Sequence, residues 1–268
     1  MKSRLRVTVG IFASFFSFYL ASVEQSAQAQ VFDRDYTQGS DVYARGSLGL
    51  FSDREFRGQN LYDGSSLQFA PQVGLGTEIG VLYVGGFAHF AVDNQDEPVT
   101  PRKSFNEYDF ELGDILKFDE FNIAVGHRWY TYSRSNPRLK DTGELFAELT
   151  TEIIAHPHFN VEYDDIRHNG WYYEFGLEQP VSLGLQNEHD AVVPSVTMGM
   201  SSGLDNGPNA IYADDGIAFV DVGLKGIFTL ADGVFVEPEM HYVEEVDDAT
   251  DSEFTFGVNF VGRTGSIQ

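Results

Sequence analysis

Residues 67–76, Leu67-Gln-Phe-Ala-Pro-Gln-Val-Gly-Leu-Gly76, alternate between apolar side chains and small or polar ones. Successive side chains of a β-strand point to opposite faces of a sheet, so this period of two predicts a strand with one apolar and one polar face. Similar stretches recur, and about twelve strands are expected to begin near residues 41, 67, 79, 107, 121, 144, 159, 171, 192, 218, 234 and 254. The sequence therefore predicts an all-β fold.

The connections between these stretches alternate in length. Residues 52–66, 93–104 and 133–142 are long and polar, whereas Thr77-Glu78 and Ala231-Asp232-Gly233 are short. Outer-membrane barrels have long extracellular loops and short periplasmic turns. We therefore expect a transmembrane antiparallel up-and-down β-barrel of about twelve strands. The connections after the fourth and eighth strands, as drawn from the sequence, are too long for periplasmic turns, which leaves the strand count open by two.

A soluble β-sandwich would also show alternation. The apolar faces here approach the nine to eleven residues that a membrane-crossing strand needs. Aromatic residues also gather near strand ends, at Trp129 to Tyr132 and Trp171 to Tyr173 for example, as they do at membrane interfaces. Both features favour the barrel.

The N-terminus has the pattern of an export signal. Met1 to Arg6 is basic, Val7 to Ala21 is apolar, and Ala27-Gln-Ala29 provides a small-residue cleavage site. A spanning helix would need about 20 apolar residues. We expect a signal peptide at 1–29, a periplasmic lead-in at 30–40, the outer-membrane barrel at 41–261 and a C-terminal extension at 262–268.

The chain is acidic and has no cysteine. Its formal net charge is −24, and the basic signal peptide makes the mature chain more acidic still. Nucleic acid is therefore excluded as a partner, because its phosphates would be repelled. The expected partners are outer-membrane lipid, lipopolysaccharide bridged by divalent ions, and small solutes or ions. A homo-oligomer stays open, and no cofactor is expected.

The polar faces of the predicted strands would line the barrel interior. Rings of carboxylates favour cations, and acids outnumber bases on these faces. The predicted selectivity residues are Arg45, Glu107, Asp109, Glu111, Arg128, Glu144, Glu148, Glu152, Glu174, Lys225, Glu237 and Glu239. These charges either leave a narrow cation-preferring channel or pair into networks that plug the barrel, and the channel is favoured.

Other chemistry is less favoured. His158, Asp164, Asp165 and His168 would suit a hydrolase at the barrel rim, but such clusters arise easily in an acidic chain, and no catalytic residue is required. The loop with Asp205, Asn206, Asp214 and Asp215 offers oxygen ligands for calcium. A solvated loop explains it better.

The segment Ser52-Asp-Arg-Glu-Phe-Arg-Gly58, followed by Asp63-Gly64, resembles the S-D-x-x-F-R-G…D-G signature of the TorF family of porin-type proteins. Weaker similarity extends over most of the mature chain. The resemblance implies an exported outer-membrane barrel of the porin type. We expect it to pass small solutes by diffusion and to have no enzymatic role. We further expect Arg57 and Gly58 to fold the first loop inward as a partial constriction.

Overall fold

The computed structural model describes residues 42–62, 64–92, 106–132, 141–185, 187, 189–204, 215–246 and 252–264. The predicted signal peptide and lead-in lie outside these residues, as do Asn94, Asp205, Asn206 and Asp214 of the long loops. None of the described residues belongs to a helix long and apolar enough to cross a membrane. The strands are β1 (Val42–Phe51), β2 (Arg54–Phe56), β3 (Gln59–Tyr62), β4 (Ser66–Gly76), β5 (Gly80–Ala91), β6 (Asn106–Lys117), β7 (Phe121–Tyr132), β8 (Thr142–Thr151), β9 (His158–Asp164), β10 (Trp171–Glu178), β11 (Val181–Ser182), β12 (Ala191–Ser202), β13 (Gly216–Ala231), β14 (Val234–Glu245) and β15 (Glu253–Thr264).

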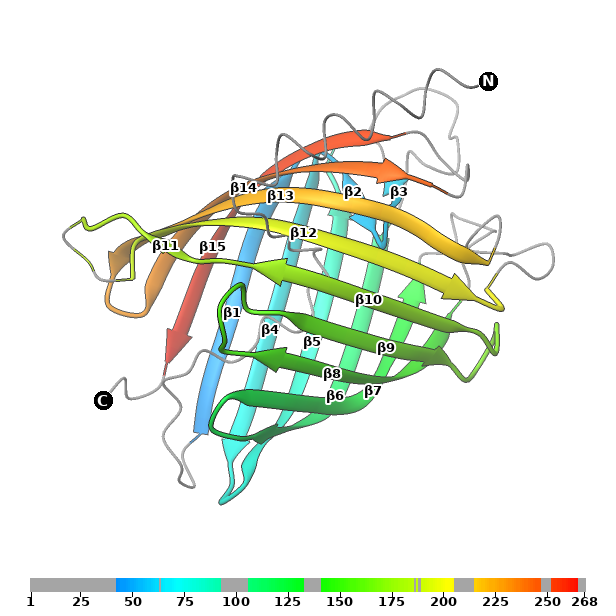
Figure 1. The fold of residues 1–268 in the computed structure, drawn as a ribbon, viewed down its shortest axis with the longest axis horizontal. Helices are drawn as coiled ribbons and strands as arrows, with labels where there is room; N and C mark the ends of the chain where they lie inside the picture. Colours follow the sequence, from blue (N-terminus) through cyan, green and yellow to red (C-terminus); the bar gives the residue numbers. More distant parts are fainter. Residues whose placement is uncertain are drawn as a thin grey trace.

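Twelve of these strands form a closed ring (Figure 1). Each long strand pairs antiparallel with its neighbours in the chain, β1 pairs with β15, and β10 pairs with β12. Short β11 adds to one end of β12, and β2 and β3 form a separate hairpin. Closure leaves no open sheet edge, as a membrane-spanning sheet requires. The prediction of an all-β barrel of twelve antiparallel strands is confirmed.

The outer surface of the ring is apolar. Leu48, Phe110 and Phe260, from three different strands, are each about half exposed, because alternate residues face away from the interior. Trp129 packs against Phe110 with ring centroids 5.5 Å apart. A soluble protein would bury such side chains, so this surface suits contact with lipid.

The short connections agree with the predicted alternation, with one correction. The fourth predicted strand was drawn only to Leu112, but β6 continues to Lys117. It does so because Gly113 and Asp114 still pair with both β5 and β7. Residues 118–120 are then a short turn. The connection after β10 remains long, and β11 lies within it.

The hairpin between β13 and β14 is as short as expected. β13 ends at Ala231 and β14 begins at Val234, with Gly233 at a φ of 67°. A left-handed residue in a tight turn favours glycine. β15 continues past the predicted barrel boundary at 261 and ends at Thr264, because its last residues still pair with β1.

Candidate functional site

The hairpin of β2 and β3 lies inside the ring of strands (Figure 1). It forms the connection between β1 and β4, and its turn consists of Arg57 (φ 52°) and Gly58 (φ 77°). Two positive φ values are typical of a type I′ turn, which favours Asn or Gly at both positions. Arginine is therefore unfavourable in this backbone conformation, and contacts of its side chain must hold it there.

Arg57 supplies those contacts at the far side of the interior. Its Nη1 and Nη2 donate to the two carboxylate oxygens of Glu144 at 2.8 Å and 2.6 Å, and it also forms an ion pair with Glu162. The guanidinium lies 4.3 Å from the ring centroid of Tyr172. Paired hydrogen bonds to one carboxylate are among the stronger side-chain contacts. The turn of the hairpin is thereby fixed to β8, β9 and β10.

Two more arginines extend this ion-pair network. Arg54 Nε donates to Glu107 Oε2 at 3.1 Å. Arg128 donates to Glu111 Oε2 at 2.8 Å and to Glu162 Oε1 at 2.9 Å. Glu162 therefore links Arg128 to the hairpin. We call the inward-facing residues of β6–β9, together with Arg54 and Arg57 of the hairpin, the paired side.

The other face of the hairpin turn packs against β13. A Cβ added to Gly58 would lie 2.4 Å from the Phe219 ring. Phe219 is fully buried, and Gly199 of β12 also approaches its ring closely. Only glycine fits such an approach at a positive φ. The hairpin turn thus spans the interior from β8–β10 to β13.

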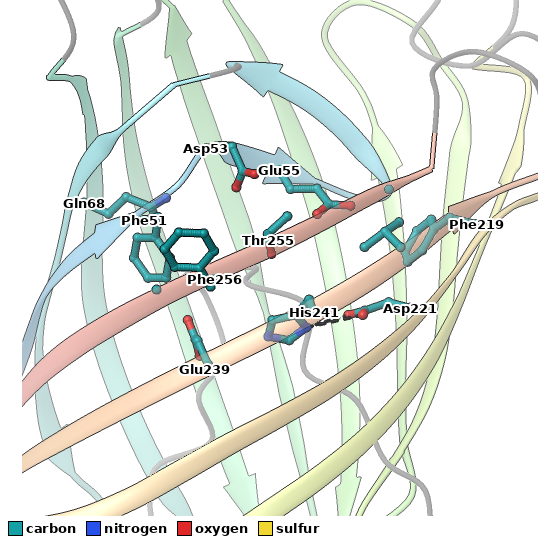
Figure 2. A pocket seen from close by; sticks show the side chains of 13 residues that line it. Phe51, Asp53, Glu55, Gln68, Phe219, Asp221, Glu239, His241, Thr255 and Phe256 are labelled. Atoms are coloured by element: carbon teal, nitrogen blue, oxygen red, sulfur yellow. Dashed lines mark hydrogen bonds and ion pairs between the residues drawn. The ribbon is translucent and has the colours of Figure 1, made fainter. Parts of the chain in front are cut away.

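A pocket remains between the hairpin and strands β13–β15. Figure 2 shows Asp53 and Glu55 on the hairpin side and Asp221, Glu239 and His241 on the strands opposite. We call this pocket and the inward-facing residues of β12–β15 the open side. His241 Nδ1 lies 3.0 Å from Asp221 Oδ2. This pair is the main direct charge pairing within the pocket.

Several buried polar atoms on the open side have no hydrogen-bond partner among the described residues. They are Ser195 Oγ, Thr197 Oγ1, Glu237 Oε2 and His241 Nε2. Buried polar groups in proteins are nearly always paired with protein or with water. Since these four atoms share the inner faces of β12 and β14, they indicate an interior that water can reach. On the paired side, Glu107 Oε1, both carboxylate oxygens of Asp109 and Asn160 Oδ1 also have no hydrogen-bond partner among the described residues. The two sides therefore differ in their arginine ion pairs and not in the presence of such atoms.

The carboxyl group of Glu55 lies in a buried and negatively charged environment. Burial raises the pKa of its carboxyl well above the usual range, and the negative charges of Asp221, Asp53, Glu253 and Glu245 raise the pKa further. The pocket thus favours any species that adds positive charge.

The structure places most of the predicted selectivity residues on the inner face. These residues fall into two groups. The paired side contains Glu107, Asp109, Glu111, Arg128 and Glu144, and the open side contains Lys225, Glu237 and Glu239. Arg45, Glu148 and Glu174 occupy inward positions of β1, β8 and β10. Glu152 differs, because β8 ends at Thr151 and Glu152 lies exposed in the following turn.

Several contributors were missing from the predicted set, among them Arg54, Tyr130 and Asp221. Arg54 lies in the hairpin, outside the barrel strands, so strand alternation gave no signal for it. Tyr130 donates to Glu144 Oε2 at 2.7 Å, and aromatic residues near strand ends were assigned to the membrane interface. Asp221 pairs with His241 across two strands. For Tyr130 and Asp221, the alternation of the strand already placed the side chain on the inner face, and this pattern could have indicated both residues.

The predicted hydrolase residues do not form one site. His158 begins β9, whereas Asp164 ends it and His168 follows in the next loop. Asp164 Oδ1 accepts from the backbone N–H groups of Arg167 and His168 at 2.6 Å and 2.9 Å, which stabilises the turn. Asp165 instead lies 3.1 Å from His127. The two histidines are therefore at opposite ends of a strand.

The described residues contain no group of His, Cys, Asp or Glu side chains arranged to hold a metal ion. Of the predicted calcium loop they include only Asp215, whose Oδ1 accepts from the backbone N–H of Gly203 at 2.5 Å.

Comparison with solved structures identifies the architecture. An outer-membrane channel from Pseudomonas putida F1 aligns with a TM-score of 0.58 and 8% identity, covering 91% of this chain and 100% of the channel. The NanC porin aligns with a TM-score of 0.47 at 11% identity, over 84% of this chain and 100% of the porin. Outer-membrane phospholipase A from Escherichia coli aligns with a TM-score of 0.44 at 15% identity, over 87% and 94%. No protein-family profile and no curated protein sequence matches the chain.

The chain has the fold of an outer-membrane β-barrel. The apolar exterior and the likeness to the Pseudomonas channel agree on this point. At such low identity the likeness concerns the fold alone, so the function must be argued from the interior.

Proposed function

We propose that this protein is a narrow outer-membrane channel of the porin type, which passes small cationic or neutral solutes by passive diffusion. The proposal includes membership of the TorF-like porins, on the strength of the Ser52 to Gly58 signature. It also includes contact of the apolar outer surface with membrane lipid and lipopolysaccharide. No chemical step is involved, so selectivity must come from the charges and width of the interior.

One observation carries this proposal: the arginines of the hairpin form ion pairs with the paired side of the interior. Arg54 and Arg57 reach Glu107, Glu144 and Glu162 there. The open side has a carboxylate-lined pocket and buried polar atoms without a hydrogen-bond partner among the described residues. A hydrated, negatively charged passage beside a fixed hairpin would admit small cations and repel anions.

A plugged barrel that serves as a surface scaffold is the second candidate. It is favoured by the contact of Gly58 with Phe219, because that contact carries the hairpin across to the opposite wall. In this case the charges would stabilise the plug and no solute would pass.

Single-channel recording of the folded protein in a planar bilayer under a KCl gradient separates the two. We expect small discrete steps and a reversal potential on the cation-selective side. A silent bilayer, with the protein verified as folded by its heat-modifiable mobility on a gel, would refute the channel and favour the scaffold. An anion-selective reversal potential would refute the assigned role of the carboxylates.

A further inference from the structure

The pocket on the open side has the features of a binding site as well as those of a passage. Figure 2 shows carboxylates approaching it from two directions, Asp53 and Glu55 from the hairpin and Asp221 and Glu239 from the strands. Acidic residues alone would be an ordinary solvated cluster. A second feature of the pocket points to a ligand.

That feature is the second nitrogen of His241. The side chain is 7% exposed and lines the pocket. Its Nδ1 pairs with Asp221, while Nε2 is buried without a hydrogen-bond partner among the described residues. A buried imidazole nitrogen without a partner is costly unless water or a ligand satisfies it. In the neutral tautomer that carries its proton on Nδ1, that N–H donates to Asp221 and Nε2 is left as an acceptor for an N–H or O–H group.

We propose that this pocket binds small organic cations with ammonium groups at both ends, of the diamine class. One ammonium group would be held by Glu55 on the hairpin, and the other by Asp221 and Nε2 of His241. This inference rests on the proposed channel only in taking such cations as its solutes, since the pocket is defined by the fold itself.

A diamine fits the pocket better than a metal ion does. The described carboxylates and histidines are not grouped closely enough to share one metal ion, whereas a diamine distributes its charge over two separated groups. The ring of Phe51 adds an apolar surface, because it lies flat over Gly49 and Gly257, where any added Cβ would clash with it. A short methylene chain could pack on such a surface.

The electrostatic environment of Glu55 also favours an added positive charge. The raised pKa of Glu55 has burial and four neighbouring carboxylates as its causes. A bound ammonium group would favour the ionised form of Glu55 and lower this pKa.

The test is isothermal titration calorimetry of the folded, detergent-solubilised full barrel with 1,4-diaminobutane, and separately with MgCl₂ at matched ionic strength. We expect saturable binding of the diamine, weakened at least tenfold by Glu55→Gln and by Asp221→Asn. Glu152→Gln removes one carboxylate from an exposed turn outside the pocket and is the matched control. It should leave binding unchanged.

Three results would overturn the site: no saturable diamine binding, binding unaffected by Glu55→Gln, or equally tight binding of Mg²⁺. Bilayer recording separates this inference from the channel itself. Diamine binding by a protein that conducts no ions would refute the channel and leave the site standing. Conduction without diamine binding would refute the site and leave the channel standing.

Discussion

The two sides of the barrel interior use the same kinds of residue for different purposes. On the paired side, three buried arginines meet Glu107, Glu111, Glu144 and Glu162 in direct ion pairs. On the open side, Glu237 Oε2 and His241 Nε2 are buried without a hydrogen-bond partner in the part of the chain that the structure describes. Acidic composition alone therefore does not define a pore. What matters is which carboxylates are satisfied by protein and which are left to water or solute.

This contrast assigns a different physical role to each side. Buried charges that lose a partner are strongly destabilising, so the paired side should determine whether the hairpin stays in place. Charges that face water contribute little to stability, but they set the potential that a passing ion experiences. Mutations on the two sides should therefore change different measurable properties.

The largest effect is expected from Arg57→Ala, which removes the ion pairs of the hairpin turn with Glu144 and Glu162 on the paired side. The change leaves Glu144 and Glu162 with less compensation and removes the contacts that hold a left-handed arginine in the turn. Loss of one partner of a buried ion pair costs about 3–5 kcal/mol. We expect a lower free energy of unfolding in urea and a several-fold larger single-channel conductance, because the hairpin is released.

Arg57→Lys is the matched control, since it keeps the charge but loses the two-point contact with Glu144. Its stability and conductance should fall between those of the wild type and of Arg57→Ala. An Arg57→Ala protein with wild-type conductance would show that the hairpin does not limit the passage.

A smaller effect should come from neutralising one carboxylate on each side. Glu111→Gln removes the charge that Arg128 Nε contacts at 2.8 Å, and a hydrogen bond to a charged group contributes about 1.5–3 kcal/mol. Glu237→Gln changes a carboxylate whose Oε2 has no hydrogen-bond partner among the described residues, so its stability should change less than that of Glu111→Gln. Urea unfolding measures the first quantity, and reversal potentials under a KCl gradient measure selectivity.

We expect the two variants to change different properties. Glu111→Gln should lower stability with a minor change in selectivity, whereas Glu237→Gln should lower the cation preference with a smaller change in stability. If both variants change the same property, the division of the interior into two sides is wrong.

The barrel itself could be predicted from the sequence because strand alternation is a local property. The strand at 67–76 and the turn Ala231-Asp232-Gly233 need only near neighbours to form, and both agree with the structure. The sequence predicts too short a strand for β6 because Asp114 interrupts the apolar face formed by Tyr108, Phe110 and Leu112, whereas Gly113 lies on the opposite face. Its pairing with Tyr83 and Gly126 continues the strand, and that pairing depends on distant residues.

The two sides could not be predicted, because they depend on contacts across the barrel. Arg57 meets Glu144, 87 residues away in the sequence, and no local pattern indicates that partner. The signature around Arg57 and Gly58 suggested an inward loop. It did not predict that the hairpin turn would pack against Phe219 on the opposite side.

The smallest change in mean conductance is expected from Gly58→Ala, which acts where the hairpin meets the open side. Gly58 has a φ of 77°, and an added Cβ would press on the buried Phe219 ring. The left-handed conformation alone costs an L-residue about 1–2 kcal/mol. Since the ion pairs of Arg57 remain, we expect the hairpin to loosen without leaving the interior. Single-channel records should then show flickering between closely spaced conductance levels.

Gly46→Ala provides the control for this last change, because Gly46 has open space around its Cβ position and no positive φ. It adds the same methyl group to a barrel wall strand, so its records should match those of the wild type. If Gly58→Ala is also silent, the turn must tolerate the added methyl by shifting away from Phe219, and the ion pairs on the paired side alone would hold the hairpin. If both alanines cause flickering, the effect belongs to the barrel wall and not to the hairpin.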